Sequence, residues 1–278
     1  MKINVTTLSE NSAGMPDVLA EWGLSMLVEV DGYTVLFDAG RSISVSHNAD
    51  LLGVDLGKIE KIVLSHGHFD HIGGLHSVLS RMKKQIEVIA HPDIWENKYK
   101  HRQDQDDKFI GIPHQRSELE SLGAVFRLSR QPVYITENIL TTGEVPMVTE
   151  FEQIDSGLWV KDATKSLPDE LLDDRALIIK TEAGLAIILG CAHRGMVNTI
   201  RHARQLTGVN NIYAVLGGAH LLNAEEEQVW QTIAFLKDTG VQKLGLCHCT
   251  GLPVMALLAQ EFGDGFFYNC AGTQVELL

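Results

Sequence analysis

The chain of 278 residues has few cysteines and no long apolar runs, and each shortage excludes a class of protein. Its cysteines, at positions 191, 247, 249 and 270, are too few and too clustered for a disulfide framework. No apolar run approaches the ~20 residues that a membrane span needs, and the first residues show no secretory pattern. We therefore expect a cytoplasmic protein with reduced thiols and no membrane insertion.

Basic residues are also in short supply. Lys and Arg total 23 against 36 Asp and Glu, which gives a formal net charge of −13. A field of that sign repels phosphodiester backbones, so nucleic acid is not an expected partner. A small anionic substrate is compatible with this charge if local cations receive it. The sequence gives no indication of oligomeric state.

No internal repeat and no low-complexity linker divides the chain, so we expect a single domain over residues 1–278. Each half contains hairpin strands followed by alternating strands and helices. The first hairpin joins residues 24–30 and 33–38 through Asp31-Gly32, and the second lies within residues 176–190. Two face-to-face sheets with helices outside would bury these strands. The predicted fold is therefore α/β (α+β), an αββα sandwich of two mixed sheets.

The strongest chemical signal is the run His66-Gly67-His68-Phe69-Asp70-His71, which follows a predicted strand at residues 61–65. Imidazole and carboxylate ligands together suit zinc, iron or manganese. A chain leaving a strand can aim His66 and His68 to one side, while Asp70 and His71 reach a second point past a turn. The run predicts half of a dinuclear metal centre.

Distant residues must complete such a centre, because each ion needs about three protein ligands and an open position. His193 and His248 each follow an apolar strand, as His66 does, so three strand ends can deliver histidines to one sheet edge. We assign one ion to His66, His68 and His193, and the other to Asp70, His71 and His248.

The run from Ser65 to Leu75 resembles the signature of the metallo-β-lactamase superfamily, and residues 36–40 (Leu-Phe-Asp-Ala-Gly) resemble its strand-Asp-small-Gly segment. Later segments are similar to one branch, the dihydropterin–ribofuranosylaminobenzene phosphate synthases and related metal-dependent hydrolases: residues 48–49, 142–146, 190–195, 216–221 and 247–251. The resemblance implies that Asp38 supports the loop of residues 66–71, which we call the metal loop. It also implies two divalent metal ions, zinc first, with iron or manganese as alternatives.

The chain departs from the superfamily pattern where a Gly-Asp pair usually supplies a bridging aspartate, because Gly190 is followed by Cys191. Several readings stay open: the Cys191 thiolate contacts a metal, water alone bridges, or Asp173 or Asp174 substitutes. Cys191 is equally compatible with a small buried apolar residue. Cys247 and Cys249 alternate with His248 along an extended chain, so both are predicted to pack away from the site.

Further residues are assigned to catalysis or substrate. Asp70 is expected to orient the attacking water as well as ligate, and His220, which ends a predicted strand, to line the pocket. Arg194 opens the predicted helix 195–207, whose free N–H groups would form an anion site, and Asn48 is assigned to substrate binding. The irregular segment 93–165 is a candidate lid or insertion that receives a phosphate or carboxylate, with a solvated loop as the alternative. Its cations are Lys98, Lys100, His101, Arg102, His114 and Arg116.

These residues predict a metal-dependent hydrolase that activates water on a small anionic substrate, because a dinuclear centre supplies both a nucleophile and charge stabilisation. One alternative is a transferase that condenses a dihydropterin diphosphate with a ribofuranosylaminobenzene phosphate. Others are an iron-dependent oxidoreductase and an inactive metal-binding module on the same fold.

Overall fold

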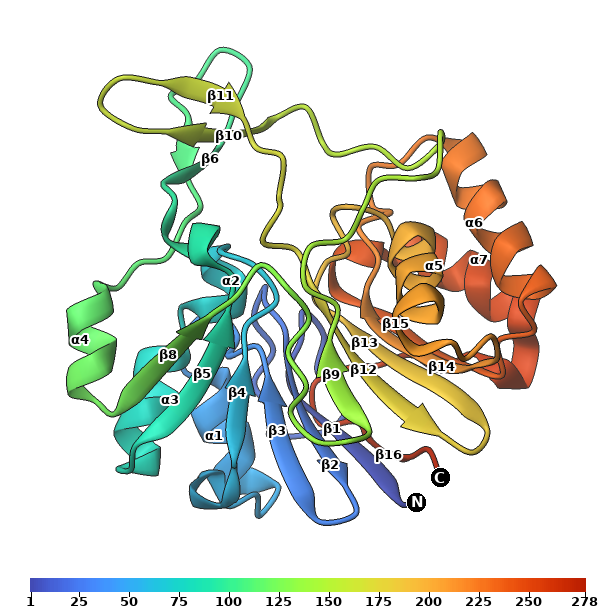
Figure 1. The fold of residues 1–278 in the computed structure, drawn as a ribbon, viewed down its shortest axis with the longest axis horizontal. Coiled ribbons are helices and arrows are strands. Elements are labelled where there is room, and N and C mark those ends of the chain that lie inside the picture. Colours follow the sequence, from blue (N-terminus) through green and yellow to red (C-terminus); the bar gives the residue numbers. More distant parts are fainter.

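Two β-sheets pack face to face in the computed structural model, which describes all 278 residues, and helices cover both outer sides (Figure 1). The first sheet has seven strands: β16 (Gln274–Glu276), β1 (Ile3–Ser9), β2 (Ser25–Val30), β3 (Tyr33–Phe37), β4 (Lys61–Val63), β5 (Ile86–Ala90) and β8 (Ala124–Leu128). The second has five: β15 (Lys243–Cys247), β14 (Ile212–Gly218), β13 (Gly184–Leu189), β12 (Ala176–Thr181) and β9 (Ile139–Thr141).

The outer helices divide between the sheets. The first sheet carries α1 (Ser44–Leu51), α3 (Leu75–Met82) and α4 (Arg116–Ser121). The second carries α5 (Met196–Thr207), α6 (Glu226–Asp238) and α7 (Leu252–Phe262). The predicted αββα sandwich is confirmed. None of these helices has the length and apolar character needed to cross a membrane.

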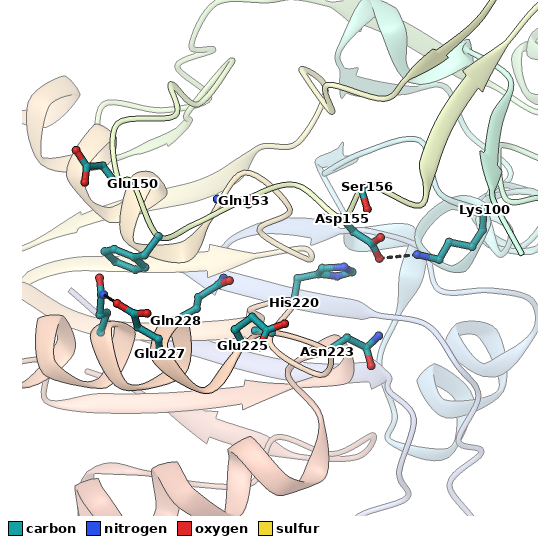
Figure 2. Close-up of a pocket in the computed structure, with 13 residues that line it drawn as sticks. Lys100, Glu150, Gln153, Asp155, Ser156, His220, Asn223, Glu225, Glu227 and Gln228 are labelled. Atoms are coloured by element: carbon teal, nitrogen blue, oxygen red, sulfur yellow. Dashed lines mark hydrogen bonds and ion pairs between the residues drawn. The ribbon is translucent and has the colours of Figure 1, made fainter. Parts of the chain in front are cut away.

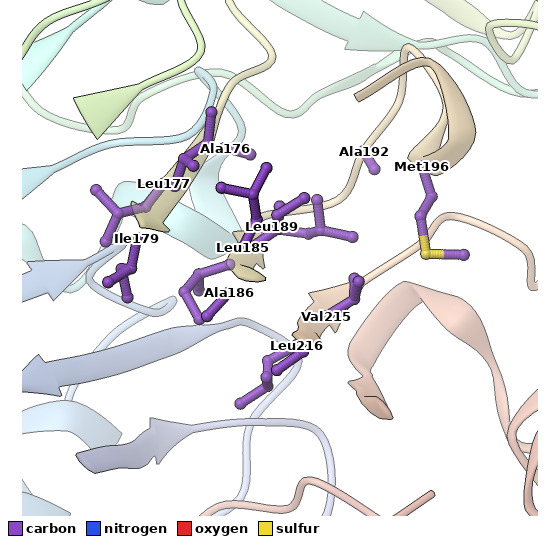
Figure 3. Close-up of a cluster of buried hydrophobic side chains, with 14 of the residues drawn as sticks. Ala176, Leu177, Ile179, Leu185, Ala186, Leu189, Ala192, Met196, Val215 and Leu216 are labelled. Carbon is purple, nitrogen blue, oxygen red and sulfur yellow. The ribbon is translucent and has the colours of Figure 1, made fainter. Parts of the chain in front are cut away.

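Strand alternation decides which core each side chain enters. In β2, Met26 and Val28 join the large cluster shared with the second sheet. Leu27 lies between them in sequence and packs instead in the cluster beneath α1 and α3. Figure 3 shows part of the large cluster, where Leu177 and Val215 of the second sheet contribute. The two sheets therefore share one apolar interior that fixes their relative position.

Parallel strands bring the chemistry-bearing segments to one edge. Strands β3, β4, β5 and β8 run parallel in the first sheet, and β13, β14 and β15 in the second. Carboxyl ends of parallel strands meet at the same edge of a sheet. The segments that leave these ends carry Asp38, residues 66–71, residues 191–193, His220 and His248.

The segment 93–165 is not one insertion, because its parts join different sheets. We call the four-stranded sheet of β6 (Lys98–Lys100), β7 (Lys108–Phe109), β10 (Leu158–Lys161) and β11 (Ser166–Pro168) the small sheet; it lies at the top of Figure 1. Between its halves the chain returns to the sandwich, where β8 pairs with β5 and β9 with β12. Residues 93–165 are therefore not a single lid or insertion, contrary to the expectation.

Candidate metal centre

The two predicted ligand trios lie together at the shared edge of the sheets. The ligand atoms of His66, His68 and His193 all lie within 4.8 Å of one another. The same holds for Asp70, His71 and His248. In the first trio His66 Nε2 is 3.0 Å from His68 Nδ1, and in the second His71 Nε2 is 3.3 Å from His248 Nε2.

These spacings fit ligands around metal ions. Metal–nitrogen bonds of about 2.0–2.1 Å at a tetrahedral angle place neighbouring ligand atoms about 3.3–3.4 Å apart. Both ring nitrogens of His193, and Nε2 of His68, are buried without a hydrogen-bond partner, a state that needs some other partner. Burial lowers the pKa of His66, His68, His193 and His248 well below 6.5, which leaves neutral rings with free lone pairs. The donor set therefore fits divalent ions.

Asp38 holds the metal loop, as the resemblance implied. Its Oδ1 accepts the backbone N–H of Ser65 and its Oδ2 the Ser65 hydroxyl, both at 2.7 Å. His71 Nδ1 donates to Asp38 Oδ2 at 2.6 Å, which leaves Nε2 facing the centre. Burial lowers the pKa of His71, but the Asp38 carboxylate outweighs it and raises the pKa to about 9. Ser65 Oγ also lies 2.8 Å from His66 Nδ1 and so orients a second ring.

Glu10 and Asn11, which were not predicted as site residues, orient His248. Glu10 Oε1 accepts the backbone N–H of His248 at 2.8 Å, and Asn11 Oδ1 lies 2.9 Å from its Nδ1. The pair follows the apolar strand β1 directly, which is the same signal that singled out His66 after β4. That signal was available in the sequence.

The end of β13 approaches the metal loop closely. A Cβ at Gly190 would lie 2.2 Å from Ser65 Oγ, so a side chain there would push the strand away. Cys191 follows with its Sγ 3.2 Å from His71 Nε2. The structure does not gather Asp173 or Asp174 with the candidate ligands, because neither belongs to a group whose ligand atoms lie within 4.8 Å of one another.

Cys249 faces the site, contrary to the prediction that it packs away. Residues His248–Thr250 form the short helical turn η3, and His248 has a left-handed φ of +54°, so extended alternation stops at Cys247. The Cys249 Sγ consequently lies within 4.8 Å of the ligand atoms of Cys191 and His248. Cys247 stays in the apolar core, as predicted.

His220 lies beside the first trio, with its ring centroid 4.1 Å from that of His193. Its φ of +46° is uncommon for a residue with a side chain, and its Nδ1 is buried without a partner. Burial lowers the pKa of His220, but the adjacent Cys249 outweighs it and raises the pKa. Burial likewise raises the pKa of Cys249, but hydrogen bonds with Cys191 and His220 lower it to about 5. The contact between the two side chains thus raises the pKa of His220 and contributes to the lowered pKa of Cys249.

A cavity of about 380 Å³ opens onto the candidate ligands. Residues of both trios line it, together with Cys191, Cys249 and His220. Four cations also line it, namely Arg41, Lys100, Arg102 and Lys108. In a chain of net charge −13 this local excess of cations favours an anionic occupant.

Only two of the six cations proposed for segment 93–165 reach this cavity, Lys100 and Arg102. The others have partners elsewhere: Lys98 with Asp169 and Asp173, His101 with Asp107, His114 with the Gly73 carbonyl, and Arg116 with Glu120. Arg41 and Lys108, which were not predicted as site residues, both lie over the Phe69 ring at 5.2 Å from its centroid. The small sheet thus supplies part of the cavity wall.

Arg194 does not face the substrate cavity, and this prediction is wrong. Its Nε donates to the Val145 carbonyl at 2.5 Å, and its guanidinium also donates to the Glu170 carbonyl. The expected anion site at the start of α5 is filled by Glu152, whose carboxylate accepts the N–H groups of Val197 and Asn198 at 2.7 and 2.8 Å. The Arg194 side chain and the first N–H groups of α5 therefore form bonds within the fold.

The assignment of Asn48 to substrate binding is also wrong. Asn48 is fully buried, and its Nδ2 donates to the carbonyls of Leu8 and Leu19 at 2.7 and 2.8 Å. Its Oδ1 accepts the Leu19 N–H at 2.8 Å. These bonds fasten α1 to β1 and to the segment that follows it.

A second cavity of about 710 Å³ adjoins the first (Figure 2). The cavities share Lys100, Asp155, His220 and Asn223, and Lys100 Nζ is paired with Asp155 Oδ2 at 2.5 Å. The rest of its wall is mainly glutamate and glutamine side chains, so it differs in charge from the first cavity. In the view of Figure 2, His220 lies between the Lys100–Asp155 pair and the glutamates near α6.

A two-sheet sandwich with a histidine-rich centre at the carboxyl ends of its strands defines a class of metal-dependent proteins. The family model of the metallo-β-lactamase superfamily matches residues 23–160. A 7,8-dihydropterin-6-methyl-4-(β-D-ribofuranosyl)-aminobenzene-5′-phosphate synthase of Methanocaldococcus jannaschii is 34% identical over 275 residues, which cover 95% of this chain and 93% of that protein. The chain belongs to the metallo-β-lactamase superfamily.

Solved structures agree with this membership. The crystal structure of a metal-dependent hydrolase of the β-lactamase superfamily superposes with a TM-score of 0.85 at 25% identity, covering 98% of both chains. Zn²⁺-bound PqqB from Methylobacterium extorquens has a TM-score of 0.59 at 14% identity, covering 98% of this chain and 99% of that one, which shows the fold alone.

Proposed function

We propose that this chain is a dinuclear metal-dependent hydrolase of a small anionic substrate that bears a phosphate or carboxylate. The observation that carries the proposal is the pair of ligand trios opening into a cavity lined by four cations. When bound, two divalent ions would activate water at neutral pH and stabilise developing negative charge. Zinc suits this imidazole-rich donor set, with iron or manganese as alternatives.

The chain's own side chains would bind and orient the substrate. Arg102 and Lys108 would receive the anionic group, because both line the cavity and neither is held by a buried carboxylate. Asp70 Oδ2 lies 3.5 Å from His248 Nε2, close enough to the second trio to orient a water as well as ligate. His220 would donate a hydrogen bond from its ring to a substrate oxygen. The small sheet would limit the entry of bulk water.

A panel assay tests the proposal. Protein reconstituted with zinc should hydrolyse at least one member of a panel of phosphoesters, lactones and thioesters, and the His193→Ala variant should be inactive on it. The matched control is His202→Ala, because His202 bonds the Thr142 carbonyl away from the ligands. Equal activity in the His193→Ala variant would remove the proposed role of the centre.

A transferase is the second candidate, and two observations favour it. The synthase relative is 34% identical over nearly the whole chain. The second cavity leaves room for another substrate group, uncharged or cationic, beside the first. A dihydropterin diphosphate incubated with and without ribofuranosylaminobenzene phosphate separates the two functions. Release of pyrophosphate that requires the acceptor supports the transferase, whereas release without it supports hydrolysis.

A further inference from the structure

Cys191 occupies a central place among the candidate ligands. Cys191 is only 3% exposed. It follows β13, the central strand of the second sheet, where Gly190 permits close approach to the metal loop. It belongs to three of the five groups whose ligand atoms lie within 4.8 Å of one another. Its partners in these groups are His66 with His71, His193 with His220, and His248 with Cys249. These partners include members of both trios.

No carboxylate takes this central place. Asp173 Oδ2 accepts the Gly67 N–H at 2.7 Å and its Oδ1 bonds Lys98 at 3.0 Å. Asp174 Oδ2 accepts the Arg194 N–H at 2.9 Å. The Cys191 sulfur is instead 3.2 Å from His71 Nε2. The same His71 nitrogen also lies 3.3 Å from His248 Nε2.

We propose that Cys191 is a thiolate ligand shared by both metal ions. The inference rests on the proposed metal centre. On metal binding the S–H bond of Cys191 breaks, the sulfur keeps the electron pair and binds metal, and the proton leaves to solvent. A thiolate is a softer ligand than a carboxylate, so the site favours zinc, cobalt or cadmium over magnesium or manganese.

Cobalt substitution gives a readout that is independent of activity, because a thiolate bound to Co²⁺ produces a sulfur-to-metal charge-transfer band in the near ultraviolet. The wild-type protein loaded with two equivalents of Co²⁺ should show this band, and Cys191→Ser should lose it. Cys247→Ser is the matched control, since Cys247 is equally buried and belongs to no ligand group. Cys249→Ser is the decisive comparison, because Cys249 shares a ligand group with Cys191 and His248. A band that Cys249→Ser loses and Cys191→Ser keeps would overturn the proposal.

Two ligand variants test whether the sulfur reaches both ions. His193→Ala removes a ligand of the first trio and His248→Ala one of the second, so each should retain one Co²⁺. A band in both variants supports a shared thiolate, whereas a band in only one makes Cys191 a terminal ligand and overturns the proposal. If either variant fails to fold, Cd²⁺ bound to wild-type protein at both sites gives the same information, because a shared sulfur couples to two ¹¹³Cd nuclei.

The failures of the two proposals are distinguishable. Wild-type protein that binds two ions without the band overturns the role of Cys191 and leaves the metal centre standing. A band that persists in Cys191→Ser has the same meaning. Wild-type protein that binds no metal overturns the proposed function itself.

Discussion

Lys98 joins the small sheet to the metal loop through a buried charge network. The side chain is fully buried, and its Nζ lies 2.8 Å from Asp169 Oδ2 and 3.0 Å from Asp173 Oδ1. The other oxygen of Asp173 accepts the N–H of Gly67, which lies between the candidate ligands His66 and His68. A change at Lys98 should therefore affect both stability and metal binding.

The variant Lys98→Met keeps the side-chain volume and removes the charge, leaving two carboxylates without their cation. Breaking a buried ion pair in this way costs about 3–5 kcal/mol. Burial raises the pKa of Asp169 even with Lys98 beside it, so desolvation already offsets part of the attraction. We expect a loss near the lower end, about 3 kcal/mol in the free energy of unfolding.

The assay is denaturant unfolding of the zinc-free protein, with Lys61→Met as the control. The Lys61–Glu87 pair is partly exposed at 3.4 Å, so its loss should cost at most about 1 kcal/mol. Adding Asp173→Asn to Lys98→Met should restore part of the loss, because the amide oxygen can still accept the Gly67 N–H. A Lys98→Met loss no larger than that of the control would refute the reasoning.

The buried contacts of Lys98 with Asp169 and Asp173 also predict how alkaline pH changes the stability. Burial lowers the pKa of Lys98, but Asp173 and Asp169 outweigh it and raise the pKa above its ordinary value of 10.5. A raised lysine pKa stabilises the fold fully below 10.5, and this contribution disappears as pH rises through the folded-state value. The stability difference between wild type and Lys98→Met should thus be constant from pH 7 to 10 and shrink only above that range.

Two further variants test the neighbourhood of the site. Asp38→Asn should weaken zinc affinity by about 10–100-fold in a chelator competition, because the His71 ring loses its charged acceptor; unchanged affinity would contradict this role. Arg102→Ala should raise KM for an anionic substrate with little change in kcat, whereas Arg194→Ala should leave KM unchanged because that side chain bonds backbone carbonyls. An increase in KM confined to Arg194→Ala would reverse the assignment.

Much of the fold could be predicted because many of its strands have a clear sequence pattern. Residues 86–90, 176–181 and 243–247 are strands with the predicted bounds, since each is a short apolar run between turn residues. The small sheet was missed because its strands are only two to four residues long and three of the four carry lysines. Such short strands show no apolar alternation. Such strands form only because neighbouring segments pair with them.

The candidate ligands were predicted for a related reason. His66, His193 and His248 each follow an apolar strand, and parallel strands deliver such residues to one edge. Cys249 was misplaced because alternation assumes an extended backbone, and the left-handed φ of His248 cannot be read from sequence. Arg194 was misplaced because the partner that fills the anion site, Glu152, is distant in the chain.

The metal content of reconstituted protein tests the central claim most directly. After dialysis against zinc and removal of loosely bound ions, the account predicts two zinc ions per wild-type chain. It predicts about one ion in His193→Ala, which loses a ligand of the first trio, and two in His202→Ala. A wild-type chain that retains no zinc, or a His193→Ala chain that retains two ions, would contradict the account.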